Sequence, residues 1–171
     1  MLTIRKYRQG DAKQAGILIA DTFHTFNLAG LTIRQQQEML GPFLYARSSE
    51  PSLQKAIVDA IRAPTVLVAK MDGRIVGVLR GGRVDERGRT VLQSLFVSGS
   101  CHRQGIGRKL VERFEKEYTG RGVTVFKLLS TLHAVPFYQA MGYRKSTGVR
   151  SIHSFDGQGL PSLPMKKVVK T

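Results

Sequence analysis

Two glycines lie one residue apart where a segment typical of a strand gives way to one typical of a helix. The stretch CHRQGIGRKL, residues 101–110, places Gly105 and Gly107 between Arg103 and Arg108. Glycine lets the backbone approach a ligand closely, and the unpaired N–H groups at a helix start attract phosphate together with the helix dipole. The arginines would add positive charge. These residues predict a phosphate-binding turn; the alternative is a tight turn with solvated arginines.

Two familiar phosphate loops do not fit this stretch. A P-loop counted from Gly99 requires a second glycine at the position of Gln104. A dinucleotide-binding fingerprint requires a third glycine at the position of Leu110, with an acidic residue further along a parallel βαβ unit. A phosphate site at this turn would therefore have to be of another kind.

The elements around the turn are predicted from hydrophobic periodicity and turn residues. One apolar stripe predicts a helix from Ile106 to Tyr118. Other helical segments are predicted over 11–26, 32–46, 51–62 and 132–141. Strands are predicted over 2–8, 64–70, 74–82, 90–97, 122–130, 142–149 and 162–170, with turns at 71–74 and 156–159. No repeat or linker is visible, so the sequence predicts one α/β domain over 1–171.

The segment from Leu92 to Leu110 resembles the acetyl-CoA-binding segment of the GCN5-related N-acetyltransferase (GNAT) superfamily. That family's signature is Arg or Gln, two residues, Gly, one residue, then Gly or Ala. Here it reads HRQGIG, so His102 departs from the usual Arg or Gln. A second stretch, STLHAVPFYQAMGY, is similar to a later helix of the family, with Thr131 where asparagine is common. It keeps register at Ala134, Tyr138, Gly142 and Tyr143.

The resemblance implies a mixed, mostly antiparallel central sheet flanked by helices. Its fourth and fifth strands, here 91–97 and 123–130, are expected to splay so that acetyl-CoA lies between them. The fourth strand would pair with the pantetheine amides, and the turn would hold the pyrophosphate. The implied cofactor-binding residues are Leu95, Phe96, Val97, His102, Arg103, Gln104, Gly105, Ile106, Gly107, Arg108 and Thr131. No metal is expected.

The implied reaction is direct attack of an amine on the thioester. Tyr138 is the family-matched general acid for the leaving thiolate, and the alternative is a tyrosine that only packs on the core. Neither strand supplies the usual carboxylate base, because no acid occurs over 87–111 or 118–155. His133 is the candidate base, with deprotonation into water as the default. Cys101 is not expected to act as a nucleophile.

A net charge of +15 over 171 residues bears on the partners. A positive field attracts phosphates, nucleic acid, acidic proteins and anionic lipid. The basic residues are spread along the chain without an RNA-recognition motif, so nucleic acid is the least favoured partner.

The acceptor site is expected from 20–62, 81–88 and 144–155, with Phe23, Phe26, Phe43, Tyr45, Arg80, Arg83 and Arg87. Such a site suits an anionic or neutral amine.

Composition narrows the class of protein further. The hydrophobic share of 42% is ordinary for a globular protein, and no apolar run approaches the length of a membrane span. A single cysteine excludes an intramolecular disulfide. We expect a cytoplasmic acyltransferase that depends on acyl-CoA. A homodimer is compatible with this expectation. The rival interpretations are a non-catalytic acyl-CoA-binding module and a basic protein associated with ribosomes or nucleic acid; the acceptor amine and the length of the acyl donor stay open.

Overall fold

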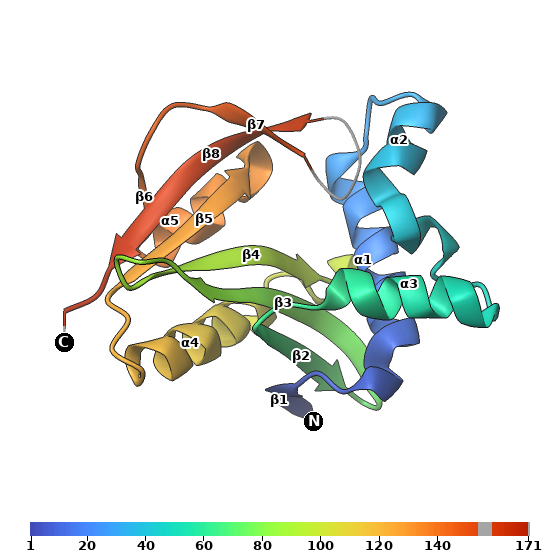
Figure 1. Cartoon of the computed structure of the whole chain (residues 1–171), viewed down its shortest axis with the longest axis horizontal. Coiled ribbons are helices and arrows are strands. Elements are labelled where there is room, and N and C mark those ends of the chain that lie inside the picture. The colour runs from blue at the N-terminus through green and yellow to red at the C-terminus, as the bar shows by residue number, and fades with distance from the viewer. Residues whose placement is uncertain (154–158, 171) are drawn as a thin grey trace.

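The computed structural model describes residues 1–153 and 159–170. Its strands form one sheet in the order β1-β2-β3-β4-β5-β8-β6, and β7 also pairs with β8 (Figure 1). The strands are β1 Leu2–Lys6, β2 Thr65–Met71, β3 Arg74–Val84, β4 Arg89–Val97, β5 Val125–Thr131, β6 Arg144–Lys145, β7 Arg150–His153 and β8 Gly159–Val168. Every pair is antiparallel except β4 with β5. The expected mixed, mostly antiparallel sheet is confirmed.

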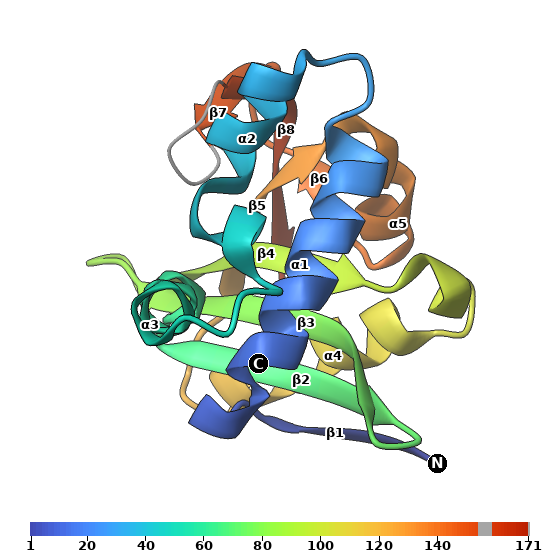
Figure 2. The same cartoon turned by 90° about the vertical axis from the view of Figure 1, so that its right-hand side faces the viewer.

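Helices cover both faces of this sheet (Figure 2). They are α1 Ala12–Asn27, α2 Ile33–Leu40, α3 Pro51–Ile61, α4 Ile106–Thr119 and α5 Val135–Ala140. Single 3-10 turns occur at η1 Gln9–Asp11, η2 Gly41–Tyr45, η3 Gly99–Cys101 and η4 Leu132–Ala134. Helices α1 and α3 pack on the face that carries Val68 and Val78, and α4 packs on the opposite face against Leu67 and Leu79. Each face of the sheet thus contributes to its own core.

Local sequence signals set the ends of several elements. Asp72 and Gly73 both have positive φ, 50° and 80°, as a two-residue hairpin turn between β2 and β3 requires. Thr32 begins α2 through a capping box, in which its side chain accepts from the Gln35 amide and the Gln35 side chain returns to its backbone. Pro51 stands in the first turn of α3, where its missing N–H costs nothing. These signals were readable in the sequence.

The splay of β4 and β5 is visible in their register. They pair only where Arg89–Leu92 faces Val125–Leu128, although β4 continues to Val97 and β5 to Thr131. Gln93 is an extra residue at this point, because Arg80 of β3 faces Ser94 while the next residue of β3, Gly81, faces Leu92. Such a bulge bends a strand and increases its twist. The predicted separation of the fourth and fifth strands is therefore confirmed.

The strand predicted over 142–149 is wrong in extent. Only Arg144–Lys145 forms β6, and the chain pairs with β8 again at Arg150–His153. The Ser146 N–H still donates to the Pro164 carbonyl at 2.9 Å, but residues 146–149 stand opposite only 163–164 of β8, so the chain bulges out of the ladder between β6 and β7. β8 in turn begins at Gly159, earlier than predicted. The turn predicted at 156–159 lies mostly outside the described residues.

Candidate active site

A cleft of about 1030 Å³ lies between the separated ends of β4 and β5. One wall is β4 from Leu92 to Val97, and the other is β5 from Leu129 to Thr131. The C-terminal part of α1, the turn before α4 and the start of α5 complete its lining. We call this space the β4–β5 cleft. It brings together segments that are far apart in the sequence, which the splay alone makes possible.

The predicted site residues converge on this cleft with one exception. Lining it are Leu95, Phe96, Val97, His102, Arg103, Gly105, Ile106, Gly107, Arg108, Thr131, His133 and Tyr138. Gln104 is exposed and does not line the cleft; its side-chain amide donates to the carbonyl of Ser100 at 3.2 Å. Gln104 therefore stabilises the turn on its solvent-exposed side. The two motifs that are separated in the sequence lie side by side at one site.

The turn before α4 has the geometry of an anion site. Gly105 adopts a left-handed conformation with φ of 75°, and Arg103 also has a positive φ of 62°. The first bond of α4 runs from the Lys109 N–H to the Gly105 carbonyl at 3.0 Å, which leaves the N–H groups of 106–108 without an acceptor in the helix. No acidic residue lies in this first turn. Backbone donors and the helix dipole thus favour an anion here.

Gly107 is required for a different reason. A Cβ atom at this position would lie 3.3 Å from the ring Cζ of Phe137 and 3.6 Å from Cγ2 of Val97. The absence of a side chain therefore lets α5 and the end of β4 close on the first turn of α4. The sequence motif pointed to both glycines but not to Phe137, whose contact depends on how α5 returns across the sheet.

Two histidines and a phenylalanine form an aromatic stack at the cleft. The Phe26 ring lies 4.8 Å from the His102 ring and 6.2 Å from the His133 ring, with both pairs nearly parallel. Nε2 of His102 is 3.0 Å from the carbonyl oxygen of Val97, and donates to it in the tautomer that carries a proton there. Burial, together with the neighbouring His102, lowers the pKa of His133 from its ordinary value of 6.5. A neutral imidazole therefore faces the cleft at neutral pH.

Tyr138 lies at the inner end of the lining. It is 6% exposed, and its ring contacts Phe137 and Tyr143 edge-on, with centroid distances of 5.0 and 5.7 Å. Burial raises the pKa of its phenol well above the ordinary value of 10.0, so the hydroxyl keeps its proton at any physiological pH. Among the described residues nothing forms a hydrogen bond with that hydroxyl. Its proton is therefore not committed to any other group of the described residues.

No Asp or Glu of the described residues lines the cleft. The buried carboxylate of Glu115 lies on the α4 side, where it accepts from the Tyr143 hydroxyl at 2.9 Å and from Lys167 Nζ at 2.7 Å. Two polar side chains of the cleft, by contrast, lack such partners. The buried hydroxyl of Ser94 has no hydrogen-bond partner among the described residues, and Arg80 has no ion pair there.

The structure brings only some of the residues expected at the acceptor site to the cleft. Of the expected aromatic and arginine side chains, Phe23, Phe26 and Arg80 line the cleft. Phe43 is fully buried in the core formed with α1 and α3, because η2 turns its ring inward. Tyr45, Arg83 and Arg87 do not line the cleft, and residues 154–155 lie outside the described part. Thr22 and Asn27 of α1 do line it and carried no sequence signal beyond their helix.

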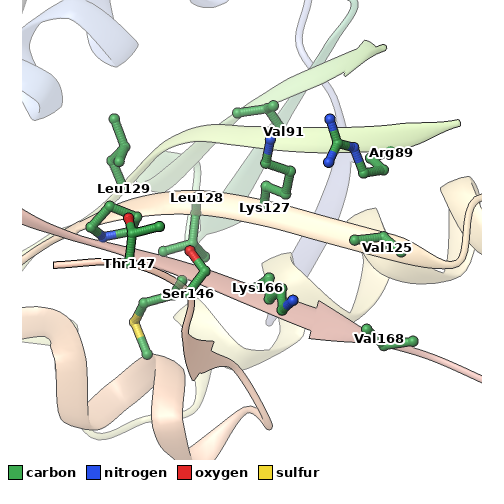
Figure 3. A pocket seen from close by; sticks show the side chains of 12 residues that line it. Arg89, Val91, Val125, Lys127, Leu128, Leu129, Ser146, Thr147, Lys166 and Val168 are labelled. Carbon is green, nitrogen blue, oxygen red and sulfur yellow. The ribbon is translucent and has the colours of Figure 1, made fainter. Parts of the chain in front are cut away.

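A second hollow, of about 620 Å³, lies over the paired parts of β4, β5 and β8 (Figure 3). No predicted cofactor-binding or catalytic residue lines it, but Ser146 and Thr147 belong to the expected acceptor stretch 144–155. Its cations include Lys127 and Lys166, which face each other directly across the β5–β8 pair, while Arg144 of β6 faces Lys166 from the other side. Directly opposite residues share one face of a sheet.

Three further features of the described part of the chain concern metals, membranes and the cysteine. No group of three His, Cys, Asp or Glu side chains there could hold a metal ion. No helix there is long and apolar enough to cross a membrane. Cys101 is buried beside the turn before α4, and its sulfur lies 3.7 Å from the Ser100 hydroxyl.

Comparisons with known proteins agree with this geometry. The model of the acetyltransferase (GNAT) domain family matches residues 32–169. The PaiA N-acetyltransferase of Thermoplasma acidophilum, solved in complex with coenzyme A, is 16% identical; the alignment covers 99% of each chain with a TM-score of 0.72. A GCN5-related N-acetyltransferase of Rhodopseudomonas palustris is 18% identical over 98% of this chain and 95% of that one, with a TM-score of 0.74.

A third similar structure is the ribosomal-protein-S18-alanine N-acetyltransferase of Escherichia coli, 18% identical over 100% of this chain and 96% of that one, with a TM-score of 0.64. No curated protein sequence matches the chain. Structures with identities this low show only that the fold is shared. The family model matches most of the sequence and therefore shows the family. The chain belongs to the GNAT acetyltransferase family.

Proposed function

We propose that this GNAT acetyltransferase transfers an acetyl group from acetyl-CoA to a primary amine of a small molecule or protein. The observation that carries the proposal is the β4–β5 cleft, which joins a phosphate-binding turn to a buried, protonated tyrosine. Residues from two sequence motifs with no other reason to meet lie in its lining. The family and the coenzyme A complex of a structural relative support acetyl-CoA as the donor.

The residues of the turn fit a pyrophosphate. The N–H groups of 106–108 are free of helical acceptors, the first turn carries no acid, and Arg103 and Arg108 add positive charge. Beyond Leu92, the edge of β4 toward β5 has no strand partner, so its amides can bind the pantetheine arm. The Val97 carbonyl is already engaged by His102, and the backbone of Phe96 pairs with Val78 of β3. This leaves both backbone groups of Leu95 and the N–H of Val97 as the backbone partners on this strand.

Acetyl-CoA, when bound, supplies an electrophilic acetyl carbon and a thiolate leaving group. The amine nitrogen attacks that carbon, the C–S bond breaks, and one N–H proton must leave while the sulfur gains one. Tyr138 holds a proton that it donates to the thiolate as general acid. His133, kept neutral by its lowered pKa, accepts the proton from nitrogen directly or through water. The imidazolium and phenolate then return to their resting forms through solvent.

The first experiment is a calorimetric titration of acetyl-CoA, followed by thiol-release assays with a panel of primary amines. We expect micromolar binding by the native protein, and turnover that Tyr138→Phe lowers by about a hundredfold or more, the usual size of a general-acid contribution. Binding of acetyl-CoA without turnover of any amine would instead favour a non-catalytic acyl-CoA-binding module. The lack of a carboxylate in the cleft is the observation that keeps this second function in view.

A further inference from the structure

The β4–β5 cleft opens toward both faces of the sheet, and the two sides differ in chemistry. Side chains alternate between faces along a strand. Leu79 packs on the α4 side and Val78 on the α1 and α3 side, so Arg80 shares the face of Val78. Its Nε donates to the carbonyl of Ile61 at the end of α3, at 2.9 Å, which confirms that direction. Arg80 therefore lies on the face opposite the helix that begins at the phosphate-binding turn.

Arg80 carries a charge that no carboxylate of the described residues compensates. Its hydrogen bonds go to two neutral carbonyls, Ile61 at 2.9 Å and Arg62 at 3.3 Å, and these account for Nε and Nη2 only. No described carboxylate forms an ion pair with it, and burial lowers the pKa of its guanidinium. The group nevertheless stays protonated, because arginine is not deprotonated in proteins. A half-buried cation without a counter-ion is costly unless something else supplies the negative charge.

Ser94 is directly opposite Arg80 across the β3–β4 pair, on the same face. Its hydroxyl oxygen is buried and has no hydrogen-bond partner among the described residues. Both side chains line the cleft. A buried hydroxyl without a partner is uncommon and usually marks a missing ligand or water. An unpaired cation and an unpaired donor thus stand next to each other, on the side of the cleft away from the phosphate-binding turn.

We infer that Arg80 and Ser94 form an anion subsite that binds a carboxylate of the acceptor, so that the acceptor is an amine that also carries a carboxylate. This inference rests on the proposed acetyltransferase function. The free N–H groups of the guanidinium and the Ser94 hydroxyl donate to the carboxylate oxygens, as charge-assisted hydrogen bonds. Phe23 and Phe26, which line the same part of the cleft, cover the apolar part of the molecule. The alternative is that Arg80 only stabilises the end of α3.

The test compares matched acceptors in the thiol-release assay. Para-(aminomethyl)benzoate and a series of ω-amino carboxylates of increasing length are each compared with their own carboxamides. We expect the native protein to prefer the carboxylates. Arg80→Met should raise the KM of the preferred carboxylate by about 10- to 100-fold, the usual worth of a charge-assisted pair, and should change the KM of the carboxamide far less. Arg80→Lys should recover part of the loss, and Ser94→Ala should raise the same KM by a few fold.

Arg62→Met is the matched control, because Arg62 is exposed, pairs with Asp59 and lies outside the cleft. Equal turnover of carboxylates and carboxamides, or an equal effect of Arg80→Met on both, would overturn the inference. Thermal unfolding of each variant reads out the structural role separately, since a lost helix end lowers the melting temperature without changing acceptor preference.

A binding arm separates this inference from the proposed function. Para-toluate and para-toluamide are titrated calorimetrically into the native protein with and without coenzyme A. Binding of the toluate that Arg80→Met abolishes supports the subsite even if no amine is turned over. If no amine is turned over and the toluate binds no better than the toluamide, the inference fails. Failure of acetyl-CoA to bind would count against the proposed function, and the toluate titration would still decide the subsite.

Discussion

Replacing Gly107 by glutamate tests the phosphate-binding turn directly. The side of residue 107 that faces Phe137 and Val97 is already filled, with a Cβ only 3.3 Å from the Phe137 ring. We expect a longer side chain to turn out of this contact toward the free N–H groups at the start of α4, because helical side chains lean toward the N-terminus of their helix. Its carboxylate would stand where the pyrophosphate is proposed to bind. Gly107→Gln is the matched control, because it has the same shape without the charge.

The size of the effect follows from Coulomb's law. Two unit charges about 4 Å apart interact by about 1 kcal/mol in water and about 4 kcal/mol at an effective dielectric constant near 20. These energies correspond to a weakening of between about fivefold and about a thousandfold. The neighbouring Arg103 and Arg108 screen part of the repulsion, so we expect glutamate to weaken acetyl-CoA binding by about 10- to 100-fold more than glutamine does.

Calorimetric titration of acetyl-CoA into the three proteins measures this difference. The gap between glutamate and glutamine should narrow as ionic strength rises, because salt screens charges at an exposed turn. Circular dichroism and thermal unfolding establish that both variants are folded. Equal weakening by the two substitutions would reduce the role of residue 107 to steric fit. Native-like binding by Gly107→Glu would refute the placement of the pyrophosphate at this turn.

Three further predictions concern other side chains. Tyr138→Phe should lower kcat by about a hundredfold or more with little change in acetyl-CoA affinity or melting temperature, because the ring packing is kept. If His133 is the base, kcat measured at saturating amine should decrease as the pH is lowered below 6.5, because protonation removes the lone pair of the imidazole. His133→Gln should abolish this acidic decrease in the pH profile. Lys166→Glu should stabilise the fold by about 0.5 to 1 kcal/mol, because it replaces the repulsion between Lys166 and Lys127 by an attraction. Lys170→Glu changes the net charge by the same amount and should not stabilise the fold.

The site was more predictable from the sequence than the strand boundaries were. Two short motifs pointed to both glycines of the turn and to Tyr138, and the family resemblance that these motifs carry implied the splay of the strands. β6 and β7 were not predictable in this way. Residues 146–149 between them stand opposite only 163–164 of β8, and no local pattern reveals this difference in length between two strands.

The acceptor side shows the same limit. Phe43 and Phe26 are both aromatic residues in helical segments, yet one is fully buried in the core and the other stacks on two histidines at the cleft. Which of them faces the site depends on the packing of α1 and η2 against the sheet, and helical spacing alone does not decide it. The pairing of Arg80 with Ser94 likewise requires the bulge at Gln93, which shifts the register of β4 by one residue.

The missing carboxylate and the uncompensated arginine have a common consequence for the proposed reaction. An acceptor amine is a nucleophile only when it has lost its extra proton, and a carboxylate next to it would stabilise the charged ammonium form. A cleft that holds Arg80, in a protein of net charge +15, has the opposite effect and lowers the pKa of a bound amine. The neutral amine is then favoured in the site itself, so a neutral imidazole or a water suffices as base. A carboxylate on the acceptor, held by Arg80 on the α3 side, would supply the attraction that a cationic amine loses in such a cleft.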